Sequence, residues 1–355
     1  MEINSVVQGA ESPLQGNKAK KRIVYFDVLN ILAALSVIFL HCNGIAHIFS
    51  DTLAWRQALA VEVLCFWAVP VFLMLSGATL MGYRKSYSTA EFFKRRFLRA
   101  AVPFVIWSLI MAAIKGINPL EIGKRAFIDS MFFSRMEGVY WFFIPLFAVY
   151  VSMPVLSLLK DNKKILWYMA GGAFTLHSLL PEIFRYMGLT WNDSLSMLTM
   201  GGYLVFPVLG YLLSTTDFSK KQRGVIYLLG IFGAVFRYFI TISDSVRDGV
   251  LNRALFQYTG WYSIFLAAAV FVFLKYFPLC KKAEKSERAA KILSTVSSCS
   301  LGVYLIHHEI ILICEKVIGY YGWEWRLFGP FLVYAISLGI VFTVKKIPLI
   351  KHIFP

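Results

Sequence analysis

The stretch Arg22–Gly44, RIVYFDVLNILAALSVIFLHCNG, decides the fold class of this chain. It contains an apolar run of about 20 residues, which is the length that crosses the hydrocarbon core of a bilayer. The run also carries an aspartate, an asparagine and a histidine. Such side chains are costly in lipid and usually face the inside of a helix bundle. The stretch therefore predicts a membrane helix with one polar face.

The composition of the whole chain agrees with a membrane protein. Of its 355 residues, 58% are hydrophobic and only 16% are charged, well below the roughly 25% of ordinary soluble domains. The net charge of +16 does not indicate nucleic-acid binding, because the basic residues cluster at the ends of apolar runs, where positive charges orient membrane helices. The five cysteines are odd in number and form no CxxC pair. Neither a disulfide framework nor a metal site is therefore expected.

Nine further apolar runs follow the first, so we expect an all-α, polytopic membrane helix bundle of about ten transmembrane helices. Of the 36 Lys and Arg residues, 25 fall in alternate connections, which assigns these connections and both termini to the cytoplasm. Residues 1–20 are predicted to be a disordered cytosolic tail, and residues 21–355 the membrane domain. The runs 165–181 and 201–214 are short enough to be compatible also with re-entrant or tilted elements. The predicted spans are 23–43, 60–82, 101–117, 139–159, 165–181, 201–214, 224–243, 258–277, 296–318 and 327–345.

The polar residues of the first span share one helix face. At 100° and 1.5 Å per residue, Asn30 and His41 lie on the same face about 16 Å apart. Asp27 lies about one turn before Asn30, so a polar stripe runs from the basic side most of the way across the membrane. Two structural alternatives remain open: Asp27 complements the helix dipole, and His41 is a neutral imidazole that hydrogen-bonds a neighbouring helix.

Three other segments carry polar groups or aromatic clusters. Glu91–Pro103, EFFKRRFLRAAVP, places arginines just before a membrane entry, where guanidinium pairs suit phosphate binding or simply orient the helix. Val139–Pro154, VYWFFIPLFAVYVSMP, has an aromatic cluster that suits sugar stacking or an interfacial aromatic belt. Ser300–Glu309, SLGVYLIHHE, holds a histidine pair, for which interhelical hydrogen bonding is the alternative role.

Together these segments resemble the type 3 acyltransferase family of integral membrane proteins, which includes bacterial polysaccharide O-acetyltransferases. The resemblance covers nearly the whole chain and rests on the order and spacing of four segments. It implies about ten membrane helices in the bacterial cytoplasmic membrane and an acyl-coenzyme A donor, most often acetyl-CoA, that arrives from the cytosol. It also implies that residues 21–355 are an acyltransferase domain that modifies a hydroxyl of a carbohydrate or lipid-linked sugar. The four segments are Phe26–His41, Lys94–Trp107, Tyr140–Pro154 and Ser300–His307.

One position departs from the family pattern. Asn30 stands where the first span of the family carries a basic residue, usually arginine. An amide can hydrogen-bond a donor oxygen but adds no charge, so neutralisation of the donor phosphates is expected from Arg22, Arg96 and Arg99. The substitution also fits a shifted donor pose, an altered donor or lost activity.

The resemblance and the polar stripe together predict a mechanism. The pantetheine arm of the donor is expected to run along the first span to His41, which acts as general base or, as a less favoured alternative, as a nucleophile that carries the acyl group. His307 is expected to orient His41 or bind the acceptor. The predicted catalytic residues are His41, His307 and Asp27; the donor-binding residues are Asn30, Arg22, Arg95, Arg96 and Arg99; and the acceptor-binding residues are Tyr140, Trp141 and Asn43.

Two functions of other classes remain open. In a transporter or flippase the polar stripe lines a solute or proton path, for which an inverted repeat is the usual signature, and the sequence shows none. The other function is that of a non-catalytic partner in a polysaccharide-export assembly, which the asparagine at position 30 favours. The expected partners are acyl-CoA, the sugar acceptor and membrane lipids.

Overall fold

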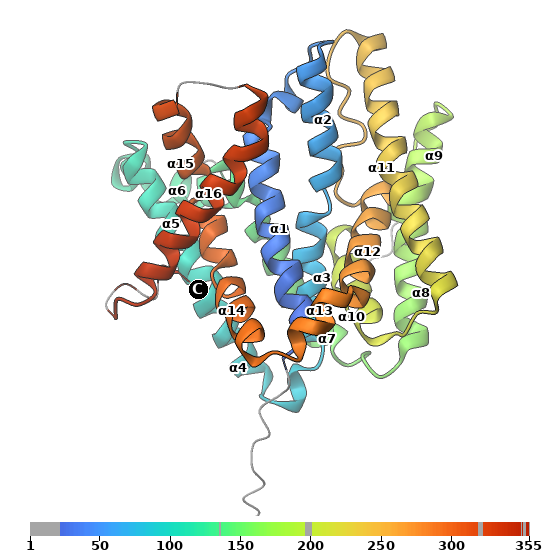
Figure 1. The fold of residues 1–355 in the computed structure, drawn as a ribbon, viewed down its shortest axis with the longest axis horizontal. Helices are drawn as coiled ribbons and strands as arrows, with labels where there is room; N and C mark the ends of the chain where they lie inside the picture. Colours follow the sequence, from blue (N-terminus) through green and yellow to red (C-terminus); the bar gives the residue numbers. More distant parts are fainter. Residues whose placement is uncertain are drawn as a thin grey trace, which may run out of the picture.

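The computed structural model describes residues 22–134, 136–195, 201–318, 322–348, 350 and 353–354. Every regular element within these ranges is helical (Figure 1), which confirms the predicted all-α class. The predicted disordered tail, residues 1–20, lies outside the described residues. The α-helices are α1 (Val24–Cys42), α2 (Leu53–Cys65), α3 (Ala68–Leu80), α4 (Thr89–Arg96), α5 (Val102–Ile114), α6 (Pro119–Phe132), α7 (Phe143–Leu156), α8 (Lys163–Ala173), α9 (Leu180–Tyr186), α10 (Val205–Thr215), α11 (Lys220–Asp248), α12 (Trp261–Tyr276), α13 (Pro278–Glu284), α14 (Glu287–Ser297), α15 (Ser300–Ile318) and α16 (Trp323–Val344).

Several of these helices are long and apolar enough to cross a membrane. Among the described residues six continuous helical segments meet this criterion, and some of them, such as Leu53–Lys85, join two of the helices named above. The number rises to as many as eight if each of two bent pairs forms one span. The bent pairs are α12 with α13, at 49°, and α14 with α15, at 51°. The predicted spans 165–181 and 201–214 are not among them; the second corresponds to a shorter apolar helix, Gly202–Thr215. A multi-pass membrane architecture is confirmed, and the count of ten stays a prediction.

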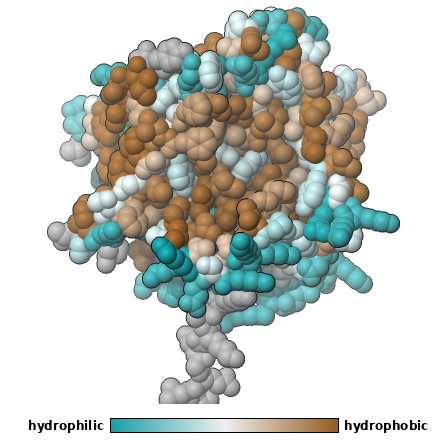
Figure 2. All heavy atoms as spheres, viewed as in Figure 1, coloured by the Kyte–Doolittle hydropathy of each residue, from teal (hydrophilic) through white to brown (hydrophobic). Residues whose placement is uncertain are grey.

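The bundle has hydrophilic residues at both ends and an apolar flank between them (Figure 2). The start of α1 lies with α4, α13 and α14 at one end (Figure 1), which we call the basic end because these helices carry many Lys and Arg residues. The starts of α2 and α16 lie at the opposite, distal end. Figure 2 shows hydrophilic residues gathered at the basic end and a largely apolar flank. An apolar flank with charged ends is the surface expected of a helix bundle in lipid.

A close crossing of α3 and α10 fixes one wall of the bundle. A Cβ added at Gly77 would lie 1.8 Å from the carbonyl oxygen of Pro207, and one at Gly210 would lie 1.9 Å from that of Met74. Only glycine lets the two backbones approach this closely, as small residues do at many membrane helix crossings. The crossing holds α3 in place beside the cavity described below.

The bend between α14 and α15 is anchored to α1. Asn30 Nδ2 donates to the backbone oxygen of Ser297 at 2.9 Å and lies 3.0 Å from its Oγ. These contacts satisfy a carbonyl group at the end of α14 that the helix itself leaves without a partner. Asn30, the residue that departs from the pattern of the family, therefore holds the bend between α14 and α15 against α1.

Candidate active site

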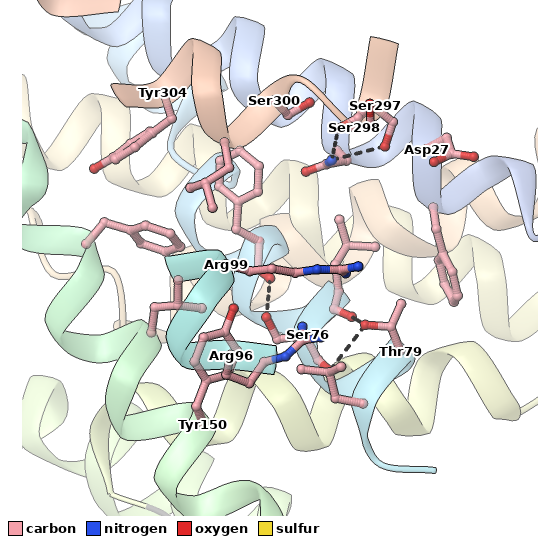
Figure 3. Close-up of a pocket in the computed structure, with 18 residues that line it drawn as sticks. Asp27, Ser76, Thr79, Arg96, Arg99, Tyr150, Ser297, Ser298, Ser300 and Tyr304 are labelled. Carbon is pink, nitrogen blue, oxygen red and sulfur yellow. Dashed lines mark hydrogen bonds between the residues drawn. The ribbon is translucent and has the colours of Figure 1, made fainter. Parts of the chain in front are cut away.

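The inner cavity lies toward the basic end and has a volume of about 320 Å³. Its walls come from α1, α3, α7, the segment that joins α4 to α5, and the bend between α14 and α15 (Figure 3). These elements are far apart in the sequence, so the cavity exists only in the folded chain. Its polar lining residues are Asp27, Asn30, Ser76, Thr79, Arg96, Arg99, Tyr150, Ser297, Ser298, Ser300 and Tyr304.

Two arginines give the inner cavity a positive charge. Arg96 ends α4, and Arg99 lies in the π-helical segment Phe97–Ala101 that follows. Figure 3 shows both side chains extending into the cavity. Among the described residues neither has a carboxylate within ion-pair distance, and Arg96 Nε is buried without a partner. Guanidinium groups that no carboxylate neutralises are suited, at this spacing, to bind phosphate.

The start of α15 adds a second feature that favours an anion. Ser300 is 1% exposed, lines the inner cavity, and its Oγ has no partner among the described residues. The free backbone N–H groups and the dipole at a helix N-terminus attract negative charge. Ser300, the first residue of α15, thus brings this end of the helix to the same cavity as the two arginines.

The remaining predicted residues at the basic end are held in ion pairs. Arg22 forms two hydrogen bonds of 2.7 Å with the buried carboxylate of Asp27. This pairing neutralises Asp27, which lines the cavity but is not free to act as a base. Arg95 pairs with Glu91 at 2.7 Å. Of the predicted donor-binding residues, Asn30, Arg96 and Arg99 line the inner cavity, whereas Arg22 and Arg95 do not.

The outer cavity, with a volume of about 430 Å³, contains the first-span histidine. The same face of α1 that carries Asn30 into the inner cavity carries His41 into this one. Tyr304 lines both cavities, and its hydroxyl donates to the carbonyl oxygen of Val139. The main polar and aromatic lining residues are His41, His47, Glu62, Phe66, Trp141, Arg253, Phe256, Tyr258, Tyr304 and His308.

Three imidazoles meet beside the outer cavity. The ring of His41 lies 5.2 Å from that of His307 and 5.8 Å from that of His308, measured between centroids. His307 is fully buried, and its Nδ1 lies 2.7 Å from the carbonyl oxygen of Tyr304. Because a carbonyl can only accept, Nδ1 carries the proton and Nε2 is left as a bare acceptor. No described residue bonds that Nε2.

His308 and Glu137 form a pair that the sequence did not predict. His308 Nδ1 lies 2.9 Å from Glu137 Oε1, and Lys115 Nζ lies 2.9 Å from Glu137 Oε2. Burial by itself raises the pKa of the Glu137 carboxyl, but the contacts with His308 and Lys115 outweigh it and hold the pKa at about 2. The only sequence signal for this pair was the position of His308 directly after His307.

The same cluster has the residue types of a metal site. Single ligand atoms of Glu137, His308 and Glu309 lie within 4.8 Å of one another. The ammonium group of Lys115 already bonds both Glu137 and the carbonyl oxygen of Met136, the latter at 2.6 Å. The cluster is therefore already compensated by a cation from the chain itself.

A buried ion pair supports the far wall of the outer cavity. Arg237 is 2% exposed, and its Nη2 lies 3.4 Å from Glu62 Oε1. Its guanidinium carbon lies 3.6 Å from the ring centre of Phe66. His47 Nε2 lies 3.8 Å from the other carboxylate oxygen of Glu62. Glu62 and Arg237 are charged residues within apolar runs of the sequence, which gives no indication that they pair across α2 and α11.

The three predicted acceptor-binding residues lie in different places. Trp141 lines the outer cavity and stacks on Tyr258 at 5.3 Å between ring centroids, and its contact with the acceptor stays a prediction. Tyr140 is buried and donates to the carbonyl oxygen of Leu305, so it lines neither the inner nor the outer cavity. Asn43 donates to the carbonyl oxygen of Arg326 and lines a separate cavity. Contact with the acceptor therefore does not fit Tyr140 or Asn43.

The helices and cavities define a multi-pass membrane protein with two adjoining polar chambers. Residues 23–345 match the family model described as an acyltransferase domain, that of the type 3 acyltransferases. The chain belongs to this family and is a membrane acyltransferase. No curated protein and no solved structure matches the chain.

Proposed function

We propose that the protein transfers an acyl group, acetyl in the first instance, from acyl-CoA in the inner cavity to a carbohydrate hydroxyl in the outer cavity. The basic end then faces the cytoplasm of a bacterial cell, where acyl-CoA is made. The acceptor is a cell-surface polysaccharide or a lipid-linked sugar at the distal end. The two chambers are thus assigned to the two substrates of one reaction.

The observation that carries this proposal is the arrangement of the two cavities around one side chain. Tyr304 lines both of them, and one face of α1 runs from Asn30 in the first to His41 in the second. At 1.5 Å per residue these two positions are about 16 Å apart along the helix. An extended thioester arm spans such a distance when it enters from the basic end and passes the ring of Tyr304.

The inner cavity supplies groups for the charged part of the donor. Arg96 and Arg99 bind its phosphates, and the start of α15 adds backbone N–H groups and the hydroxyl of Ser300. Asn30 contributes only its amide oxygen, because both described bonds of its Nδ2 go to Ser297. Arg96 and Arg99 thus supply the positive charge that the basic residue at position 30 would supply in other members of the family.

The outer cavity supplies the base. His41 removes the proton from the acceptor hydroxyl as its oxygen attacks the thioester carbon. The carbon–sulfur bond then breaks, and the leaving thiolate takes the proton back from the imidazolium. His307 and the His308–Glu137 pair lie beside His41, and the bare Nε2 of His307 accepts a hydrogen bond from the imidazolium. Trp141 and Tyr258 offer an aromatic surface to the sugar ring.

Labelled acetyl-CoA tests this function against the two alternatives. Purified protein in detergent is incubated with [¹⁴C]acetyl-CoA and candidate glycans, and the same protein in liposomes is assayed for solute flux. We expect label to appear on a glycan hydroxyl with release of free CoA. Flux without turnover would identify a transporter, and neither activity would identify a non-catalytic partner.

A further inference from the structure

A second buried arginine lies at the distal end, away from both cavities of the proposed reaction. Arg326, in the first turns of α16, is 8% exposed. Its Nη1 donates to the carbonyl oxygen of Ala54 at 2.8 Å and its Nη2 to Gln57 Oε1 at 3.3 Å. Its Nε is buried and bonds no described residue. All the partners of this charge within the described chain are therefore neutral.

A buried charge with only neutral partners is costly in a membrane protein. The contrast with Arg237 is direct, since that guanidinium has the carboxylate of Glu62 at 3.4 Å. No carboxylate of the described residues lies within ion-pair distance of Arg326. An anion from outside the chain would supply the missing countercharge.

Arg326 stands at the head of a groove that runs down the apolar flank. It lines a cavity of about 200 Å³ with Gln57 and Trp323. Val61 belongs both to this cavity and to an apolar groove of about 280 Å³ between α1 and α2. Leu64 in the groove is 61% exposed, so the groove opens onto the lipid-facing side. Figure 1 shows α1 between α2 and α16, and Figure 2 shows the apolar character of this face.

The length of the groove fits one lipid chain. Its α1 lining reaches from Asn43 beside Arg326 to Leu32. Eleven residues at 1.5 Å each give about 16 Å, close to half of the roughly 30 Å hydrocarbon core. The polar head of the groove therefore lies at headgroup depth when its apolar part lies in one leaflet. The exposed Trp323 beside the head is typical of the membrane interface.

We propose that this groove is a binding site for an anionic phospholipid. Arg326 bonds the lipid phosphate, and an acyl chain lies against α1 and α2. The lining residues of the groove are shared with neither the inner nor the outer cavity. The site is therefore independent of the proposed acyl transfer, and a failure of one proposal leaves the other standing.

Native mass spectrometry with added lipid tests the site. Delipidated protein in detergent is titrated with phosphatidylglycerol, with diacylglycerol of the same chains, and with inorganic phosphate as a competitor. We expect one phosphatidylglycerol to be retained at least about tenfold more tightly than diacylglycerol, because a charge-assisted hydrogen bond is worth about 1.5–3 kcal/mol. R326Q should remove this preference. R56Q, which changes an exposed distal-end arginine paired with Asp51, should keep it.

A second variant keeps the test decisive if R326Q does not fold. L64W adds bulk in the groove without touching Arg326 and should also weaken retention of phosphatidylglycerol. The proposal is overturned if R326Q or L64W binds this lipid like the unchanged protein. It is also overturned if diacylglycerol binds equally well, or if millimolar inorganic phosphate displaces the lipid, which would indicate a site for a small anion only.

Discussion

The position of the His41 imidazole favours its proposed role as the base over a purely structural role. It lines a cavity, and its closest ring neighbours are two other imidazoles. The His307 ring, which lies beside the ring of His41, is fixed by the bond of its Nδ1 to the carbonyl oxygen of Tyr304. Its Nε2 has no described partner. A histidine that served only to link helices would be expected to bond a single neighbour and leave no cavity beside it.

Replacement of His41 by alanine tests its role as the base. We expect kcat for acetyl transfer to fall by about 10²–10⁴-fold, the usual contribution of a general base, with normal expression and an unchanged melting temperature. The matched control is His177→Ala, since His177 lines neither the inner nor the outer cavity. A folded His41→Ala enzyme with normal turnover would remove this histidine from the mechanism.

In the proposed mechanism, Glu137 supports His41 through His308. Its carboxylate lies 2.9 Å from His308 Nδ1 and, with a pKa of about 2, is ionised at neutral pH. The substitution Glu137→Gln removes the charge and keeps the shape of the side chain. We expect kcat to fall at least about tenfold with little change in KM for either substrate, as when an anion that orients an imidazole is neutralised.

The control for this change is Asp51→Asn, which alters an exposed carboxylate paired with Arg56. It should leave both constants unchanged. If Glu137→Gln instead raised only KM for the acceptor, the residue would belong to sugar binding and not to the support of His308.

At the scale of elements, the segment from α4 to α5 is the part of the chain to which the proposed function assigns donor binding. It turns from a polar helix into a π-helical stretch just before α5, and π-helical turns are frequent at functional sites. Arg96 and Arg99 reach the inner cavity from this segment, whereas the adjacent Arg95 pairs with Glu91. Neighbouring residues of a helix point about 100° apart. The same segment can therefore direct Arg96 into the cavity and Arg95 away from it.

The double variant Arg96→Gln, Arg99→Gln should bind the donor poorly. Each guanidinium–phosphate bond is worth about 1.5–3 kcal/mol, so we expect KM for acetyl-CoA to rise at least about tenfold while kcat at saturation changes little. Arg95→Gln is the matched control and should behave like the unchanged protein. If Arg95→Gln had the same effect as the double variant, the cluster would act only through its total charge.

The sequence predicted the elements better than their directions. The apolar runs and the alternation of charge predicted a multi-pass helix bundle, and the face shared by Asn30 and His41 does line both cavities. Asn43 lies two residues from His41 and therefore about 200° around the helix, which turns it toward α16 instead. Without a neighbouring helix as reference, the sequence could not show which residues of a polar cluster face inward.

The contacts between helices that are distant in the sequence could not be predicted either, because the sequence does not show which helices are neighbours. Glu137 meets His308, and Asn30 meets Ser297, across many intervening residues. The position of Tyr304 between the cavities depends on the bend that separates α14 from α15. Trp141 and its neighbour Tyr140 belong to one aromatic motif, but only the packing of α15 decides that Tyr140 is buried.

At the scale of the whole molecule, Tyr304 lies between the inner and outer cavities, which the proposed function assigns to donor and acceptor. Its ring lines both, and its hydroxyl is tied to the carbonyl oxygen of Val139. A partition of this kind keeps water from the thioester until the acceptor is in place. The variant Tyr304→Ala should therefore uncouple the reaction, so that release of CoA exceeds acetylation of the acceptor severalfold.

The variant Tyr304→Phe is the control for this prediction, because it keeps the ring and loses only the hydroxyl. Its ratio of CoA release to acetylation should stay much closer to one. If Tyr304→Ala remained folded and fully coupled, the ring would not act as the partition.

The most direct measurement of the central claim is a cryo-EM structure of the protein in a lipid nanodisc with bound acetyl-CoA. We predict density for the phosphates beside Arg96 and Arg99, with the pantetheine arm passing Tyr304 and the thioester beside His41. Density for the donor elsewhere, or a thioester that ends in the inner cavity while Tyr304 and His41 remain out of reach, would contradict the account.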